Sequence, residues 1–282
     1  MAVTWTSVTS PSPPPSLPRS IFIESRPSPL PPSRFKPCGC RCSSESLEQT
    51  LSPIHHTFSL IQDSAVIACL RANSADLAME AAHAALAGGI SVLEIVRSTP
   101  GVFEVLQCLV QEYPTNAFGV GTVLNSRDAR RAIDSGAKFL MSPVTVKNIM
   151  KDVQDSDVLY IPGAMTPTEI FSAYETGAKM VKIYPVSALG GIRYISALKK
   201  PFPHIPMVAS QGITIDLIQD YVAQGAISVV LSDSIFNKQA MAENNFNVIH
   251  ELAQSATSEG RKAVERTSVD SRSQNSTQKC LR

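Results

Sequence analysis

Lys182 is the residue of this sequence whose surroundings point most directly to chemistry. It lies in the apolar run MVKIYP at residues 180–185, a pattern typical of a buried strand. Taking an ammonium group out of water is costly unless the group is paired or loses its proton. An unprotonated lysine is a nucleophile that can form a Schiff base with a ketone. The alternative is a structural lysine that pairs with a buried carboxylate or extends from the strand end to water.

Glu94 is a second charged residue inside an apolar run, SVLEIV at residues 91–96. Alternation along a strand puts Leu93 and Ile95 on one face and Glu94 on the other. If the face of Glu94 lines the interior of a barrel, its carboxylate can meet Lys182. A carboxylate beside a Schiff-base lysine can carry the proton transfers of carbinolamine and enamine chemistry. A structural ion pair that fills the barrel is the competing interpretation.

These two residues need elements that bring them together, and the pattern of the chain predicts such elements. Between residues 57 and 258, eight short apolar runs alternate with helix-like segments, the last of which covers residues 239–256. The pattern predicts an α/β fold with a single (β/α)₈ TIM barrel over residues 57–258. A doubly wound sheet is the alternative, but the strands continue evenly to the end of this segment. The predicted strands are Ala65–Leu70, Val92–Val96, Phe118–Val120, Phe139–Met141, Val158–Ile161, Met180–Tyr184, Met207–Ala209 and Ser228–Leu231.

The catalytic groups of such a barrel lie where the strands end, at the mouth formed by the following loops. One lysine, one glutamate within a strand and several hydroxyl groups fall at these positions. The polar residues there include Arg71, Glu94, Arg97, Ser98, Thr99, Thr122, Ser142, Lys182, Tyr184, Ser210, Gln211, Ser232, Asp233 and Ser234. Their convergence on one mouth favours an enzyme site more strongly than any of them does alone.

Both ends of the chain differ in composition from the barrel segment. Residues 1–37 hold ten of the 20 prolines, interleaved with serine, and residues 1–44 carry five basic residues against one acidic residue. Such a composition predicts a disordered transit peptide over residues 1–45, for a plastid (the chloroplast stroma) ahead of a mitochondrion. An ordinary disordered tail is the alternative. Residues 260–282, rich in Ser, Gln and Asn, are expected to form a disordered polar tail.

The remaining composition argues against several classes of partner. A formal net charge of +1 gives no electrostatic footprint of a nucleic-acid-binding protein, and no run is long enough to span a bilayer. Cys38, Cys40 and Cys42 have no histidine or acid at ligand spacing, and the five histidines are scattered. Cys69 and Cys108 lie in apolar stretches and are interpreted as small core residues. No metal site is expected.

Several motifs accompany Lys182 and Glu94 in order along the chain. They are AGGISVLE at 87–94, GVGTVLN at 119–125, IPG at 161–163 and KIYP at 182–185, followed by the glycine pair at 190–191. Together they resemble the 2-keto-3-deoxy-6-phosphogluconate (KDPG)/4-hydroxy-2-oxoglutarate (KHG) aldolase family over about residues 57–256. The resemblance implies a class I aldolase on a (β/α)₈ barrel that needs no metal or other cofactor and forms a homotrimer. Its small-molecule substrate would be a 2-keto-4-hydroxy acid, cleaved to pyruvate and an aldehyde.

The resemblance also implies roles for individual residues. Lys182 matches the Schiff-base lysine and Glu94 the general acid/base, while Thr122 matches a threonine that holds the pyruvyl carboxylate. The family places an arginine where this chain has Ser98, and Arg97 stands one position earlier. The other positions that line the pocket or contact the substrate are Pro143, Pro162, Tyr184, Ser210, Gly212 and Ser234.

The phosphate-binding end departs most from the family pattern. Gly-Gly after strand seven and Gly-Gly-Ser after strand eight, whose N–H groups cradle a phosphate in the family, are replaced by Gln211-Gly212 and Ser232-Asp233-Ser234. A carboxylate beside a phosphate dianion would be unfavourable by about 2–3 kcal/mol at a partly buried site. Val144 also replaces the glycine of a Ser-Pro-Gly motif. These changes predict that the phosphorylated sugar acid is not the best substrate.

Three hypotheses about function therefore remain open. The first is a class I aldolase acting on 4-hydroxy-2-oxoglutarate or a similar acid, or decarboxylating oxaloacetate through the same enamine. The second is KDPG aldolase proper, which yields pyruvate and glyceraldehyde 3-phosphate. The third is a non-catalytic barrel that binds a metabolite, motivated by the changes at Ser98, Val144 and Asp233.

Overall fold

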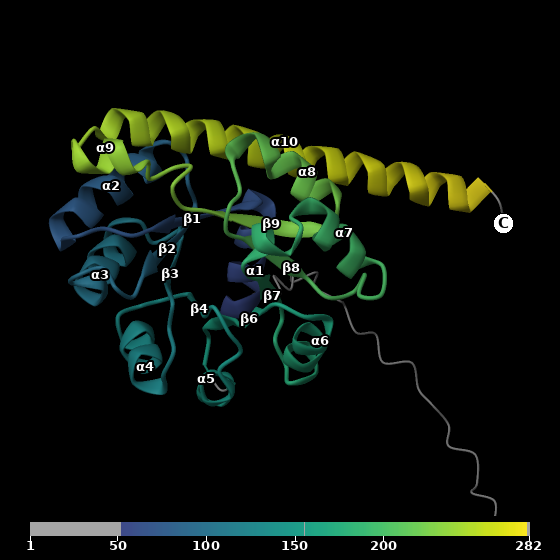
Figure 1. Cartoon of the computed structure of the whole chain (residues 1–282), viewed down its shortest axis with the longest axis horizontal. Coiled ribbons are helices and arrows are strands. Elements are labelled where there is room, and N and C mark those ends of the chain that lie inside the picture. Colours follow the sequence, from purple (N-terminus) through teal and green to yellow (C-terminus); the bar gives the residue numbers. More distant parts are fainter. Residues whose placement is uncertain (1–51, 155, 281–282) are drawn as a thin grey trace, which may run out of the picture. The chain divides into compact units, whose positions relative to one another are not determined.

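The barrel is closed by a strand that is broken in the middle. The structure, a computed structural model, describes residues 52–154 and 156–280, all within the unit Gln49–Arg282. Its nine parallel strands follow the order β5-β4-β3-β2-β1-β9-β8-β7-β6 (Figure 1). Only Pro162 separates β5, which pairs with β4, from β6, which pairs with β7. Proline cannot donate to a strand ladder, so β5 and β6 are the halves of one strand and the ring has eight positions.

The strands are short, as in other parallel barrels. They are β1 Val66–Leu70, β2 Val92–Val96, β3 Ala117–Gly121, β4 Phe139–Met141, β5 Leu159–Ile161, β6 Gly163–Ala164, β7 Val181–Ile183, β8 Met207–Ser210 and β9 Ala226–Leu231. The helices are α1 Pro53–Ser64, α2 Ala75–Ala87, α3 Val102–Glu112, α4 Ser126–Asp134, α5 Lys147–Asp152, α6 Pro167–Glu175, η1 Val186–Leu189, α7 Ile192–Lys199, η2 Ile215–Leu217, α8 Ile218–Ala223, α9 Lys238–Ala242 and α10 Phe246–Cys280. The predicted (β/α)₈ barrel is confirmed, and each predicted strand overlaps an observed one.

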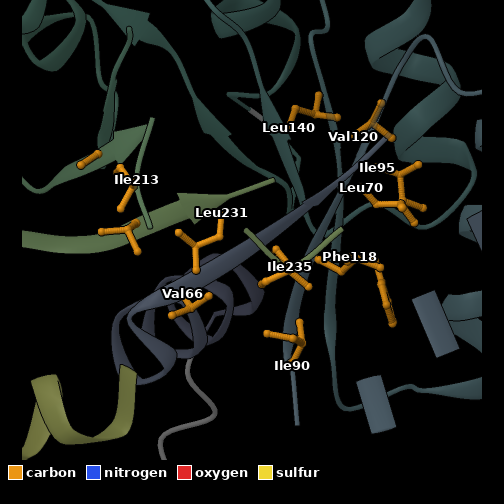
Figure 2. Close-up of a cluster of buried hydrophobic side chains, with 14 of the residues drawn as sticks. Val66, Leu70, Ile90, Ile95, Phe118, Val120, Leu140, Ile213, Leu231 and Ile235 are labelled. Atoms are coloured by element: carbon orange, nitrogen blue, oxygen red, sulfur yellow. The ribbon is translucent and has the colours of Figure 1, made fainter. Parts of the chain in front are cut away.

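Two separate apolar cores follow from the alternation of side chains along the strands. One lies between the barrel and the surrounding helices and includes Leu70, Ile95 and Phe118 (Figure 2). The other fills the interior of the barrel, where Val92 and Met180 belong to a cluster of their own. Successive side chains along a strand face opposite sides. A residue that directly precedes or follows an outer-core residue in a strand therefore points into the barrel.

The sequence analysis did not predict α1, which begins four residues before the expected start of the barrel. It contacts strands β1, β2, β3, β5 and β9 and the helix α10. Ile61 is fully buried in the interior cluster, and Ile54 and Phe58 pack against the same cluster. Three apolar residues at this helical spacing fill the base of the barrel beneath the interior cluster.

The C-terminal segment corrects two expectations. The predicted last helix over residues 239–256 is divided into α9 and α10, and α10 continues through the segment expected to be a disordered tail (Figure 1). Buried small residues on one side, Ala256, Gly260 and Ala263, explain why the helix continues into this segment. A Cβ on Gly260 would lie 2.4 Å from the backbone oxygen of Ser64, so only glycine permits this close packing against α1.

Several sequence-based predictions fall outside the described residues. The expected transit peptide over residues 1–45 and the three cysteines at positions 38, 40 and 42 lie there. Among the helices of the described part, none is long and apolar enough to cross a membrane.

Candidate active site

A cavity of about 620 Å³ opens at the C-terminal ends of the strands. Seven strands or the loops that follow them contribute to its walls, as expected for the mouth of a (β/α)₈ barrel. Its lining residues are Cys69, Arg71, Glu94, Val96, Thr122, Pro143, Lys182, Tyr184, Ser210, Gln211, Gly212, Ile213, Thr214, Val230, Ser232, Asp233 and Ser234. The structure thus brings together most of the residues that the sequence placed at the mouth.

Lys182 and Glu94 form the charged centre of this cavity. Their neighbours in β7 and β2 belong to the outer core, so both side chains point into the barrel. The Lys182 Nζ lies 3.9 Å from the Glu94 Oε1, and the two residues are 7% and 1% exposed. This distance is an ion-pair contact but too long for a direct hydrogen bond, so both groups remain available to a substrate atom. The Nζ also lies 5.5 Å from the centre of the Tyr184 ring.

The Glu94 carboxylate occupies the space that a side chain at Gly121 would fill. A Cβ on Gly121 would come within 1.5 Å of the Glu94 Oε1. Strands β2 and β3 are neighbours, and Val96 pairs with Gly121 in their register. Within the described part of the chain, the buried Glu94 Oε2 has no hydrogen-bond partner. A buried carboxylate oxygen without a partner is costly, and such atoms in native structures call for an explanation such as a catalytic role.

Cys69 lies beside this pair and was interpreted from the sequence as an ordinary core residue. It is the register partner of Glu94 in the adjacent strand β1, and it lines the same cavity. Burial raises the pKa of the Cys69 thiol well above its usual range, and the neighbouring Glu94 carboxylate raises it further. The thiol therefore stays protonated at neutral pH.

Two non-glycine residues of the cavity wall have left-handed backbone conformations. Thr122, directly after β3, has φ 60°, and Gln211, directly after β8, has φ 88°. A positive φ is a genuine outlier for a β-branched residue and costs about 1–3 kcal/mol. Strain of this kind tends to collect where it holds functional groups in place, which fits the predicted role of Thr122.

The structure places Arg97 and Ser98 differently from the expectation that they line the pocket. The Arg97 side chain turns to α4, where its Nε lies 3.0 Å from an Asp128 carboxylate oxygen, and it stacks over Phe103. Ser98 accepts a hydrogen bond of 2.7 Å from the Arg71 Nη1. Arg71 itself lines the cavity. The positive charge in this part of the cavity wall therefore comes from Arg71, which follows β1. The sequence analysis gave this residue no role.

The far side of the cavity shows how the altered phosphate-binding end is built. Gln211 accepts a short hydrogen bond from the Ser187 hydroxyl, which ties the loop after β8 to the loop after β7. Asp233 lies 3.3 Å from the Lys238 Nζ, and its side chain is 68% exposed. Ser234 donates a 2.7 Å hydrogen bond to the Ile213 carbonyl. Because Asp233 is exposed and paired, it repels an anion less than a partly buried carboxylate would.

The remaining predicted residues divide between the cavity wall and its support. Pro143, Ser210 and Gly212 line the cavity, whereas Pro162 is buried behind it and accepts a 2.8 Å hydrogen bond from the Lys182 backbone N–H. Among residues 52–154 and 156–280, no group of three or more His, Cys, Asp or Glu side chains has a geometry suited to a metal ion.

Comparisons with known proteins agree with this geometry. The family model for KDPG and KHG aldolase matches residues 58–252. The KHG/KDPG aldolase of Escherichia coli K12 is 26% identical over 204 residues, covering 72% of this chain and 95% of the relative. The 2-dehydro-3-deoxy-phosphogluconate aldolase of Treponema pallidum is 30% identical over 177 residues, covering 63% and 84%.

A solved structure gives the same result. The KDPG aldolase of Legionella pneumophila, with pyruvate captured as a covalent carbinolamine intermediate, superposes with a TM-score of 0.66 at 26% identity. The match covers 71% of this chain and 97% of that chain. The similarity therefore extends over the whole barrel of the relative.

Proposed function

Since this chain belongs to the KDPG and KHG aldolase family and is a class I aldolase, we propose that its substrate is an unphosphorylated 2-keto-4-hydroxy acid of the 4-hydroxy-2-oxoglutarate kind. The products would be pyruvate and an aldehyde. The buried Lys182–Glu94 pair inside the cavity carries the aldolase chemistry, and the Gln211 side chain at the altered phosphate-binding end carries the choice of substrate. The same site could also decarboxylate oxaloacetate, because that reaction uses the same enamine.

Lys182 begins the reaction as the nucleophile. Glu94 first takes a proton from the Lys182 ammonium, and the free Nζ then attacks the C2 carbonyl of the substrate and forms a carbinolamine. Glu94, 3.9 Å away, gives a proton to the departing hydroxyl, so that water leaves and an iminium remains. The burial of both side chains keeps bulk water away from this intermediate.

Glu94 then acts as the base for carbon–carbon cleavage. It accepts the proton of the C4 hydroxyl while the C3–C4 bond breaks, and the electron pair of that bond moves toward the iminium nitrogen to form an enamine. The aldehyde leaves, and Glu94 returns the proton to C3. Water then adds to the iminium and releases pyruvate, which restores the free amine of Lys182. These steps need no cofactor.

The pyruvyl carboxylate is held by Thr122 with help from the cation of the cavity wall. Thr122 lies at the cavity wall in its strained conformation, directly after the glycine that makes room for Glu94. The Arg71 guanidinium, oriented by its hydrogen bond to Ser98, supplies the positive charge on the same wall. Arg71 thereby takes the place of the arginine that the family pattern puts at position 98.

Discrimination against a phosphate depends more on Gln211 than on Asp233. Asp233 is exposed and paired with Lys238, so its repulsion of an anion is nearer to about 1 kcal/mol than to the larger cost expected for a partly buried acid. Gln211 instead fills space with a side chain that is tied to Ser187. A glycine there would leave the backbone N–H groups open to a phosphate.

The first test is reduction with borohydride in the presence of pyruvate, followed by mass spectrometry. We expect one reduced pyruvyl adduct on Lys182 and none in Lys182→Ala. Lys238→Ala is the matched control, because this lysine is close to the cavity but exposed, and its variant must still form the adduct. A folded protein without any adduct would refute the Schiff-base mechanism.

The second test compares kcat/KM for 4-hydroxy-2-oxoglutarate and KDPG. We expect the wild-type protein to prefer the unphosphorylated acid. Gln211→Gly should raise kcat/KM for KDPG by about tenfold, and Asp233→Gly by about fivefold or less. A strong wild-type preference for KDPG would overturn the proposed specificity while leaving the aldolase chemistry in place.

We also propose that the protein is a homotrimer. Large apolar side chains are exposed beside the active-site cavity, where Val144, Met165 and Tyr184 line a second hollow of about 590 Å³ that also includes Pro143. A neighbouring subunit would remove this surface from water. Sedimentation equilibrium should give three times the chain mass, and Val144→Ser combined with Met165→Ser should weaken association. A monomer at all concentrations would refute the proposal.

Plastid import is a further proposal, and it depends only on the composition of residues 1–45. A fluorescent protein fused behind these residues should enter chloroplasts in plant cells. Import into mitochondria, or none, would contradict it.

A further inference from the structure

Cys69 occupies a place in the site that the aldolase mechanism leaves without a task. It lies on β1 opposite Glu94 in the strand register, and both side chains line the same cavity. Next to it, the Glu94 Oε2 is buried and has no hydrogen-bond partner among the described residues. The Cys69 thiol does not bond this oxygen in the structure, but it can become its donor when the carboxylate turns toward the substrate, because an S–H group is a weak hydrogen-bond donor.

The mechanism itself creates the need for such a donor. Before the reaction, the Lys182 Nζ is the cation that faces Glu94, at 3.9 Å. During the reaction this nitrogen is bonded to the substrate, and in the enamine it carries no positive charge. Glu94 must nevertheless stay in position to return its proton to C3. A neutral donor on a neighbouring strand stays in place throughout these steps.

We propose that Cys69 is a positioning residue whose thiol donates a hydrogen bond to the Glu94 carboxylate and holds it toward the reacting carbon. This inference rests on the proposed Schiff-base function. The raised pKa of the thiol is consistent with it, since a thiol that stays protonated remains a donor and does not attack the carbonyl of the substrate.

Exchange of the pyruvate methyl protons in D₂O, followed by NMR, measures the step that Glu94 performs without requiring the aldehyde. Cys69→Ala should lower the exchange rate by about threefold to tenfold and move the acidic limb of the pH profile upward by about half a unit. The donor also favours the ionised form of the carboxylate, so its loss makes the base active only at higher pH. Cys69→Ser, which keeps a donor, should stay close to the wild-type profile.

Other charged or titratable groups that face Glu94 can also affect the pH profile of the exchange rate. Lys182 from β7, Arg71 from the end of β1, and Tyr184 and Asp233 on the cavity wall also carry or can acquire charge. All of them are unchanged in the Cys69 variants, so a shift confined to Cys69→Ala is due to the thiol. Cys108→Ala, on the exposed side of α3, is the matched control and should leave rate and profile unchanged.

The possible outcomes separate this inference from the proposed function. If the wild-type protein forms no pyruvate adduct with borohydride, the Schiff-base function fails and this inference fails with it. If the adduct forms but Cys69→Ala keeps the wild-type profile, only the role of Cys69 is refuted. An equal loss in Cys69→Ala and Cys69→Ser, with an unshifted profile and a lower melting temperature, would show that Cys69 serves packing alone and would also refute it.

Discussion

Gly121→Ala should uncouple the two catalytic residues, because it places a methyl group where the Glu94 carboxylate lies. The added Cβ would be 1.5 Å from the Glu94 Oε1 and 2.4 Å from its Cδ, whereas ordinary contact begins at 3.4 Å. The carboxylate must therefore move by about 2 Å. Glu94 can make this shift by turning its carboxylate within the adjacent cavity, and that turn changes its direction toward Lys182.

A displacement of this size predicts a large loss in the proton transfers that Glu94 carries out. Misplacing a catalytic group by about 1 Å can cost about 100-fold in rate, so exchange of the pyruvate methyl protons should slow by at least about that factor. The adduct with Lys182 should form more slowly than in the wild-type protein, because Glu94 also protonates the departing hydroxyl, but it should still accumulate under borohydride because the nucleophile itself is unchanged. The predicted signature is a trapped lysine without proton exchange.

The assay is NMR of pyruvate in D₂O, with Glu94→Gln as the comparison. If both changes act through the same carboxylate, the double variant should be no slower than the slower single variant. Exchange within about twofold of wild type in a folded Gly121→Ala protein would show that the Glu94 carboxylate is not the base. A further drop in the double variant would show that Gly121 acts by some other route.

Two more predictions concern the stability of the barrel. Gly260→Ala should lower the free energy of unfolding by about 1–3 kcal/mol, as measured with urea, since its Cβ would lie 2.4 Å from the Ser64 oxygen; an unchanged midpoint would refute the close packing of α10. Glu169→Gln should remove a small pH-dependent contribution, of about 0.5 kcal/mol, at the start of α6. The backbone N–H groups of Met165 and Thr166 lower the pKa of Glu169, so its contribution is present above the unfolded pKa of about 4.3 and is lost as the pH falls through the folded value. The two proteins should therefore differ at pH 7 and converge near pH 3, and a constant difference would contradict the reasoning.

The strands were predictable because their signal is local. In β2 the sequence alone gives the bounds Val92–Val96 and puts Glu94 on the opposite face from Leu93 and Ile95, since alternation fixes which residues share a face. The structure adds that the face of Glu94 is the inner one. Helix α10 was not predictable over its full length. Its packing uses Ala256, Gly260 and Ala263, and such small residues give a weak hydrophobic pattern although they permit close approach.

The site was predictable to the level of strand ends but not of side-chain direction. Lys182 and Thr122 follow from strand position and family motif, whereas the destination of Arg97 depends on Asp128 and Phe103, more distant partners on other elements. The role suggested for Cys69 has no sequence signal at all. A cysteine in an apolar run looks the same whether it faces a core or a carboxylate.

The two halves of the cavity differ in how closely they follow the pattern of the family. The half that handles pyruvate keeps a buried Lys182–Glu94 pair and the glycine that makes room for it. Such a pair is costly in stability and would bring no benefit in a barrel without catalysis. In the other half, Gln211 and Asp233 stand where the family pattern has glycine, Gly212 remains, and Gln211 is bound to Ser187. A glutamine that is held by its own hydrogen bond, despite a positive φ, supports the proposed preference for an unphosphorylated substrate.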